Sequence, residues 1–97
     1  MKSNRKRISL VTGCAGFIGF HTTIKLLQNG STVVGIDNLN NYYDRSLKQS
    51  RLNEIRNYSK KYRKKFFFFK YNINDISSIR KIFKKFNFEK VFHLAAQ

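Results

Sequence analysis

The sequence predicts an α/β fold in which helices cover both faces of a parallel β-sheet. Four short apolar segments alternate with three longer segments whose apolar residues recur at helical spacing. A helical connection between two buried strands makes the strands parallel and the crossover right-handed. The length of 97 residues suits one small domain or a part of a larger one, and we see no internal repeat or domain boundary.

The first half of the chain predicts two strands and a helix between them. Residues 8–12 and 32–36 are rich in β-branched residues, which is typical of buried strands. Between them, apolar residues recur at spacings of three and four, at Phe17, Phe20, Ile24 and Leu27. The dipeptide Asn29-Gly30 predicts the end of this helix, and residues 38–43 are expected to form a turn.

The second half predicts two helices and two strands. A helix is expected from Asp44 to the basic pair Lys64-Lys65, with an apolar face at Leu47, Arg51, Ile55, Tyr58 and Tyr62 and Leu52 beside it. Residues 66–70 include four consecutive phenylalanines, so we expect both faces of this third strand to be covered. Asp75 is expected to cap a third helix whose apolar face is Ile76, Ile79, Phe83 and Phe86. Residues 90–94 predict the fourth strand.

The net charge of +15 would favour contact with nucleic acid, an anionic membrane or a phosphorylated ligand. Most basic residues, however, interleave with apolar helical positions, as expected on the solvated faces of helices. A dedicated nucleic-acid site is therefore not the leading interpretation. The single cysteine, Cys14, cannot form an internal disulfide, favours a reducing compartment and has no evident partner that would activate it as a nucleophile.

The N-terminus resembles an export signal in one respect, because basic residues 1–7 precede the uncharged segment 8–20. No small-x-small cleavage pattern follows this segment, and its three glycines would weaken a signal helix. It is also shorter than the ~20 residues that span a bilayer. We expect a soluble, cytoplasmic chain without membrane contact.

Three glycines, Gly13, Gly16 and Gly19, lie between the first strand and the first helix. In this setting one glycine permits a tight turn, one lets backbone N–H groups approach a pyrophosphate, and one lets the helix pack closely on the strand. The helix N-terminus then binds the phosphates, and we expect Phe17 and Ile18 to be backbone donors. The spacing G-x-x-G-x-x-G differs from the commoner G-x-G-x-x-G of dinucleotide sites.

An acidic residue at the end of the second strand supports the same interpretation. Asp37 lies roughly 20 residues after the glycines, where a carboxylate accepts hydrogen bonds from the adenosine ribose hydroxyls. Its charge would repel a 2′-phosphate, and no arginine stands at positions 14 or 38, so NAD is favoured over NADP. Alone, Asp37 followed by Asn38 would also suit a turn.

Two further segments follow strands at the same expected edge of the sheet. Asp75 could accept a hydrogen bond from the adenine amine while Ile76 covers the ring, although Asp75 is equally well explained as a helix cap. The small residues of Leu94-Ala95-Ala96 would let backbone lie against the cofactor, or simply end a buried strand. We expect His21 and His93 to be packed and hydrogen-bonded, and we find no metal-ligand spacing.

With these residues in place, the chain resembles the extended short-chain dehydrogenase/reductase superfamily, and within it the NAD-dependent nucleotide-sugar epimerases and dehydratases. V-T-G-C-A-G-F-I-G at 11–19 is similar to that family's glycine motif, and residues 35–52 resemble the corresponding segment of UDP-glucuronate 4-epimerases. The resemblance implies a Rossmann-type fold. It also implies that Asp37-Asn38, Asp75-Ile76 and residues 93–96 contact the ribose, the adenine and the far side of NAD.

In that family, bound NAD takes a hydride from C4 of a UDP-sugar and returns it to the opposite face, while a Tyr-x-x-x-Lys pair transfers protons. This pair is absent here, because the residues four positions after the five tyrosines are Ser46, Leu47, Tyr62, Phe66 and Asp75. In the family the pair, the sugar-binding domain and the usual homodimer helices lie further along the chain. We therefore expect residues 1–97 to be the N-terminal part of an epimerase's Rossmann domain, truncated after the fourth strand, with no second domain and no catalytic residue.

Two alternatives remain open at this point. The chain could be a free-standing basic module that binds nucleic acid or another polyanion, which would show salt-dependent binding. It could also be a functionless remnant, which would be unfolded or aggregated and show no response to NAD.

Overall fold

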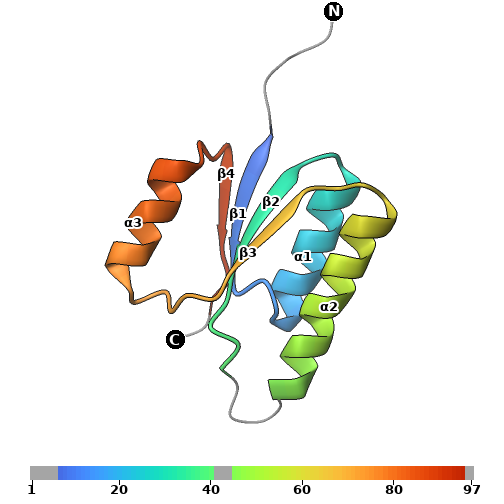
Figure 1. Cartoon of the computed structure of the whole chain (residues 1–97), viewed down its shortest axis with the longest axis horizontal. Helices are drawn as coiled ribbons and strands as arrows, with labels where there is room; N and C mark the ends of the chain where they lie inside the picture. Colours follow the sequence, from blue (N-terminus) through green and yellow to red (C-terminus); the bar gives the residue numbers. More distant parts are fainter. Residues whose placement is uncertain (1–6, 41–44, 96–97) are drawn as a thin grey trace, which may run out of the picture.

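The computed structural model describes residues 7–40 and 45–95. Strands and helices alternate in the predicted order (Figure 1): β1 (Ile8–Thr12), α1 (Phe17–Gln28), β2 (Thr32–Ile36), α2 (Arg45–Lys61), β3 (Phe66–Phe69), α3 (Ile76–Lys85) and β4 (Lys90–His93). The predicted α/β fold is confirmed, although β3 and β4 each end one residue earlier than expected and α2 ends at Lys61, before the expected basic pair Lys64-Lys65. Residues 41–43 of the expected turn and Asp44, the expected helix start, lie outside the described residues.

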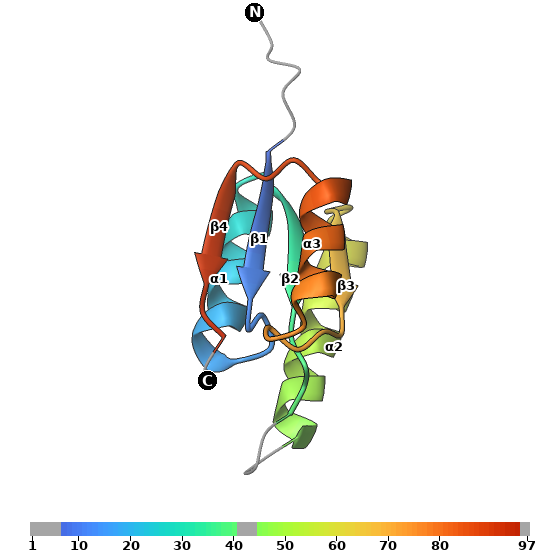
Figure 2. The ribbon, with the colours of Figure 1, turned by 90° about the vertical axis from the view of Figure 1, so that its left-hand side faces the viewer.

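The sheet is parallel and its strand order is β3-β2-β1-β4. The central strand β1 therefore pairs with β2 on one side and with β4 on the other, and Figure 2 shows β4 and β1 side by side and pointing the same way. Strand order reverses at β1. In sheets of this kind, ligands bind outside the carboxyl ends of the strands at such a switch point.

Helices lie on both faces of the sheet (Figure 1), with α1 and α2 on one side and α3 on the other. Neighbouring strand residues point to opposite faces, so each apolar strand supplies two cores. The core under α1 and α2 contains Val11, Cys14, Leu27, Val33 and Ile55. The core under α3 contains Leu10, Val34, Ile36 and Ile82. This two-sided burial explains why neighbouring residues are both apolar in β1 (Leu10, Val11) and in β2 (Val33, Val34).

The prediction that both faces of β3 are covered is wrong at one residue. Phe66 and Phe68 pack on the α1–α2 side, and Phe69 packs on the α3 side, but Phe67 stays 43% exposed. The ring of Phe86, 5.7 Å from the Phe67 ring, gives it partial cover where the chain leaves α3. Because β3 lies at the edge of the sheet, no further strand shields it among the described residues.

Two predicted helix faces also need correction. In α2 the residues facing the sheet are Leu52 and Ile55, whereas Leu47 and Tyr62 are exposed. In α3 the buried residue is Ile82, with Ile79 and Phe86 packed beside it, whereas Ile76 and Phe83 are exposed. On each helix, the apolar residues that face the sheet therefore differ in part from the predicted ones. The sequence does not distinguish them, because several adjacent stripes on these helices carry apolar residues.

No described helix combines the length and the apolar character that a membrane span requires.

Candidate functional site

A cleft of about 570 Å³ opens at the carboxyl ends of β1, β2 and β4. It brings together most of the predicted cofactor-binding residues, namely Gly13, Gly16, Phe17, Ile18, Gly19, Asp37, Asn38, Leu94 and Ala95. These residues come from three separate segments of the chain, so the fold, and not sequence proximity, assembles them. Their contact with a cofactor stays a prediction.

The glycine loop is compact because side chains are absent where its backbone turns. Gly13 has φ +75, which favours glycine, and a Cβ there would lie 2.8 Å from the Cα of Ala95. A Cβ on Gly19 would overlap the carbonyl oxygen of Gly13. Gly13 therefore makes the turn against the end of β4, and Gly19 lets α1 pack closely on the loop.

The N-terminus of α1 faces the cleft with free backbone donors. The first N–H groups of any α-helix lack intrahelical acceptors. Gly16 occupies the N-cap position and has no side chain to accept from them. Together with the positive end of the helix dipole, the N–H groups of the first turn make a favourable position for an anion.

The carboxylate of Asp37 accepts hydrogen bonds from two segments at the cleft, the glycine loop and the segment after β2. Its Oδ2 accepts from the backbone N–H of Ala15 at 3.0 Å, within the glycine loop. Its Oδ1 accepts from the backbone N–H of Leu39 at 2.7 Å. Asp37 is only 4% exposed, so these bonds fix the direction of the carboxylate at the end of β2.

Sequence reasoning missed two basic residues that α2 brings to this site. Lys48 Nζ lies 3.1 Å from Asp37 Oδ1 and lines the cleft. Arg51 Nη1 donates to the carbonyl oxygen of Ala15 at 3.2 Å, and its guanidinium lies 5.9 Å from the centre of the Phe17 ring. Their spacing could have indicated this, because residues three positions apart lie on the same face of a helix. The lysines of this helix were expected to face solvent, and Arg51 was expected on its apolar face.

Thr12 joins the ends of β1 and β4. Its Oγ1 accepts from the backbone N–H groups of Leu94 and Ala95 at 3.0 and 3.2 Å, and lies 2.9 Å from His93 Nδ1. Two incoming bonds occupy the lone pairs of the hydroxyl oxygen, so its own proton donates to His93 Nδ1. The neutral imidazole then carries its proton on Nε2. The hydrogen bond expected for His93 is confirmed.

The expected packing of the two histidines is wrong, because both side chains are exposed. His21 makes edge-to-face contacts with the rings of Phe17 and Phe20 on the surface of α1. Cys14 is buried, and burial followed by the nearby charge of Asp37 raises the pKa of its thiol. This disfavours the reactive thiolate. Within residues 7–40 and 45–95, no three metal-ligating side chains gather at one place.

The segment Asp75-Ile76, which was expected to contact adenine, lies at the start of α3. Asp75 caps α3, since its carboxylate accepts from the backbone and the hydroxyl of Ser78, so the helix-cap alternative is confirmed. These hydrogen bonds lower the pKa of Asp75. Asp75 and Ile76 do not line the cleft, whose wall here is residues 71–74. Their contact with adenine stays a prediction, and Ala96 lies outside the described residues.

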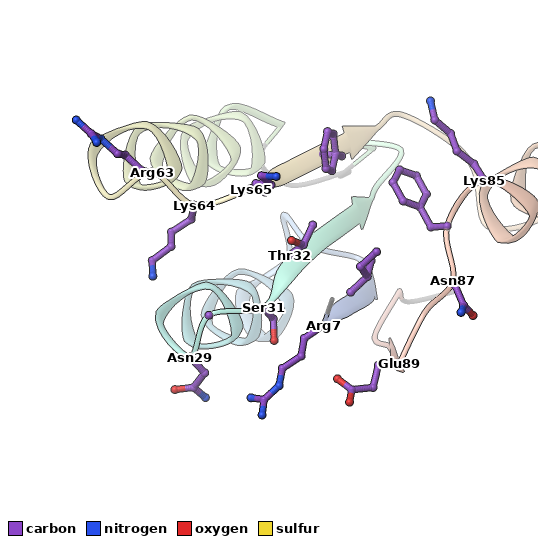
Figure 3. A pocket seen from close by; sticks show the side chains of 14 residues that line it. Arg7, Asn29, Ser31, Thr32, Arg63, Lys64, Lys65, Lys85, Asn87 and Glu89 are labelled. Carbon is purple, nitrogen blue, oxygen red and sulfur yellow. The ribbon is translucent and has the colours of Figure 1, made fainter. Parts of the chain in front are cut away.

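A larger cavity, of about 960 Å³, lies at the opposite edge of the sheet, where β1 and β2 begin (Figure 3). Its lining is basic, with Arg7, Arg63, Lys64, Lys65 and Lys85. The segments that follow α1, α2 and α3 also meet there, and cations at the C-terminal ends of helices offset the negative helix dipoles. The cations at the end of α3 and after α2 are therefore placed where they interact favourably with helix dipoles.

Comparison with known proteins finds a matching family model and similar sequences. The family model described as GDP-mannose 4,6 dehydratase matches residues 10–97. The chain is 44% identical over 88 residues to UDP-glucuronate 4-epimerase 4 of Arabidopsis thaliana, covering 91% of this chain and 19% of that protein. It is 42% identical over 88 residues to UDP-glucuronate 4-epimerase of Thermodesulfobacterium geofontis, covering 91% of this chain and 26% of that protein.

Solved structures show the same likeness. A UDP-glucose 4-epimerase from Thermotoga maritima, crystallised with UDP-glucose, matches with a TM-score of 0.72 and 39% identity, over 93% of this chain and 24% of that one. A UDP-glucuronic acid 4-epimerase from Bacillus cereus, in complex with NAD, matches with a TM-score of 0.68 and 32% identity, over 92% of this chain and 27% of that one. The chain thus spans about a quarter of the length of these proteins.

Proposed function

Because the chain belongs to the GDP-mannose 4,6 dehydratase family, among the NAD-dependent epimerases and dehydratases of the short-chain dehydrogenase/reductase superfamily, we propose that its glycine cleft binds NAD. The observation that carries the proposal is the bond from the Ala15 N–H to Asp37, which joins the glycine loop to the acidic end of β2. In the proposed complex this bond would hold the phosphate-binding loop beside the carboxylate that accepts from the ribose.

The residues present fit the cofactor. The N–H groups of Phe17 and Ile18 at the start of α1 would hold the pyrophosphate. The carboxylate of Asp37 would accept from the ribose hydroxyls, with Asn38 beside it. Residues 71–76 would surround the adenine, and residues 94–96 would lie against the far side.

Within a longer polypeptide, this cleft would serve a UDP-sugar 4-epimerase, with a UDP-sugar as substrate and a homodimer as the assembly. NAD supplies the hydride acceptor and donor in such a reaction. The 97 residues carry no Tyr-x-x-x-Lys pair, so their own contribution is to bind and orient the cofactor. We propose that they form the N-terminal part of one Rossmann domain in a cytoplasmic protein.

Calorimetric titration of the chain with NAD tests this function. We expect binding in the wild type and an affinity at least tenfold lower in Asp37→Ala, because a bond to a charged acceptor contributes about 1.5–3 kcal/mol. Glu54→Ala is the matched control, since Glu54 is an exposed carboxylate on α2. Absence of binding in the folded wild type, or an equal loss in both variants, would contradict the proposal.

A further inference from the structure

The cleft has a charge balance that the sequence alone does not reveal. Among the described residues that line it, the charged ones are Asp37 and Lys48. Their side chains are 2% and 17% exposed and their charged atoms lie 3.1 Å apart. Screening by water is weak at such a position, so Lys48 offsets part of the negative charge of Asp37.

Lys48 is also fixed in place by a second contact. Its Nζ donates to the backbone carbonyl of Asn40 at 3.2 Å as well as to Asp37. Three residues along the same helix, Arg51 adds another cation at the carbonyl of Ala15. The ribose end of the cleft thus has one carboxylate and two cations around it, where the sequence had indicated a carboxylate without compensation.

We propose that Lys48 is a specificity-determining residue of the dinucleotide site. It helps to fix the carboxylate of Asp37 that would accept from the ribose, and it also provides the positive charge that a 2′-phosphate would require. Selectivity for the unphosphorylated ribose then depends on the pair, because the Asp37 carboxylate repels a phosphate and engages the charge of Lys48. This inference rests on the proposed function, because it concerns the ligand of the same cleft.

The preference between the two dinucleotides follows from the hydrogen-bonding capacity of Asp37. An ionised carboxylate only accepts hydrogen bonds, so Asp37 can accept from a ribose hydroxyl but has nothing to donate to a phosphate. An asparagine at position 37 keeps the shape, removes the negative charge and releases Lys48 from its ion pair. The released ammonium would then form a charge-assisted hydrogen bond to a 2′-phosphate.

The test measures the affinities of NAD and NADP for the wild type, Asp37→Asn, Lys48→Met and the double variant. In Asp37→Asn we expect the ratio of NADP to NAD affinity to rise at least tenfold. In the double variant we expect most of that gain to disappear, because the phosphate loses its cation. Lys60→Met, an exposed lysine at the other end of α2, is the matched control and should leave the ratio unchanged.

Each outcome decides the matter. A gain in Asp37→Asn that survives the loss of Lys48, or no gain although the wild type binds NAD, overturns the role of Lys48 and leaves the proposed function intact. If no folded variant binds either dinucleotide, both proposals fail. Thermal unfolding without ligand shows which variants are folded. If Asp37→Asn is unfolded, Asp37→Ser provides a second variant without the carboxylate.

Discussion

Thr23 on α1 is a buried polar residue whose hydroxyl is unused. Its side chain is fully buried, and Oγ1 has no hydrogen-bond partner in the described part of the chain. Thr23→Val keeps the branched shape and removes the cost of burying a free hydroxyl. We expect the free energy of unfolding to rise by about 1 kcal/mol in urea denaturation followed by circular dichroism. Thr22→Val, the same change at the neighbouring half-buried position, should have little effect, and destabilisation by Thr23→Val would refute the prediction.

Gly19 is the residue at which a single methyl group would distort the cleft. The added Cβ of Gly19→Ala would overlap the Gly13 carbonyl oxygen, so the helix and the loop must separate. We expect a loss of about 1–3 kcal/mol in the free energy of unfolding, together with a large loss of NAD affinity. Gly30→Ala is the control, because φ is +91 there but an added Cβ meets nothing within 4 Å. It should lower stability only, and equal losses of NAD affinity would contradict the prediction.

At the same scale, the sequence predicts the site residues whose roles depend on their own segment, and it misses residues that reach the site from another element. Gly13 and Asp37 were found because turn geometry and strand ends leave a mark on neighbouring residues. Lys48 and Arg51 were not, because a long side chain on an amphipathic helix looks the same whether it reaches solvent or another segment. The wall made by residues 71–74 likewise depends on how the loop after β3 folds over the sheet.

At the scale of elements, α3 depends on the ionisation of its cap. Hydrogen bonds from Ser78 lower the pKa of Asp75 in the folded chain below its usual 3.8. A lowered folded pKa means that the carboxylate stabilises the fold above pH 3.8, and that this contribution is lost as pH falls through the folded pKa. Asp75→Ala should therefore be less stable than the wild type at pH 6, and the difference should shrink toward pH 2.

Urea denaturation across this pH range measures the effect. Glu54→Gln is the control, as it alters an exposed carboxylate on α2. A gap between wild type and Asp75→Ala that stays constant from pH 6 to pH 2 would show that the side chain acts through something other than its charge.

The boundaries of β1 and β2 were predictable because β-branched residues and glycines define them, but helix faces were not. Ile79 and Ile82 in α3 and Phe86 just after it face the sheet, and the neighbouring stripe at Ile76 and Phe83 is as apolar yet exposed. Only the position of the sheet decides between the stripes. Strand order was equally hidden, because the period of a strand reports its faces and not its neighbours.

For the whole molecule, charge repulsion opposes folding. With 20 basic and 5 acidic residues, like charges crowd the surface and gather at the basic cavity. Salt shortens the Debye length from roughly 10 Å at 0.1 M to about 3 Å at 1 M. We expect the thermal midpoint to rise with sodium chloride, and Lys64→Gln to raise it at low salt and weaken its dependence on salt.

Lys81→Gln is the matched control for this prediction. Its charge lies near the carboxylate of Asp75 and attracts it, so its removal should not raise the midpoint. If Lys64→Gln lowers the midpoint at low salt, the basic cavity is stabilised by its cations through the helix ends more than it is strained by their repulsion.

The hydroxyl of Thr12 joins residues that are 82 positions apart, whereas the bond from Ala15 to Asp37 spans 22. Closing the longer loop costs about 1 kcal/mol more chain entropy than closing the shorter one. During folding, the contact between the glycine loop and the end of β2 is thus expected to form early, and the contact between β1 and β4 is expected to form last. The cleft would then be assembled in two stages, with its ribose side formed before the side that β4 contributes.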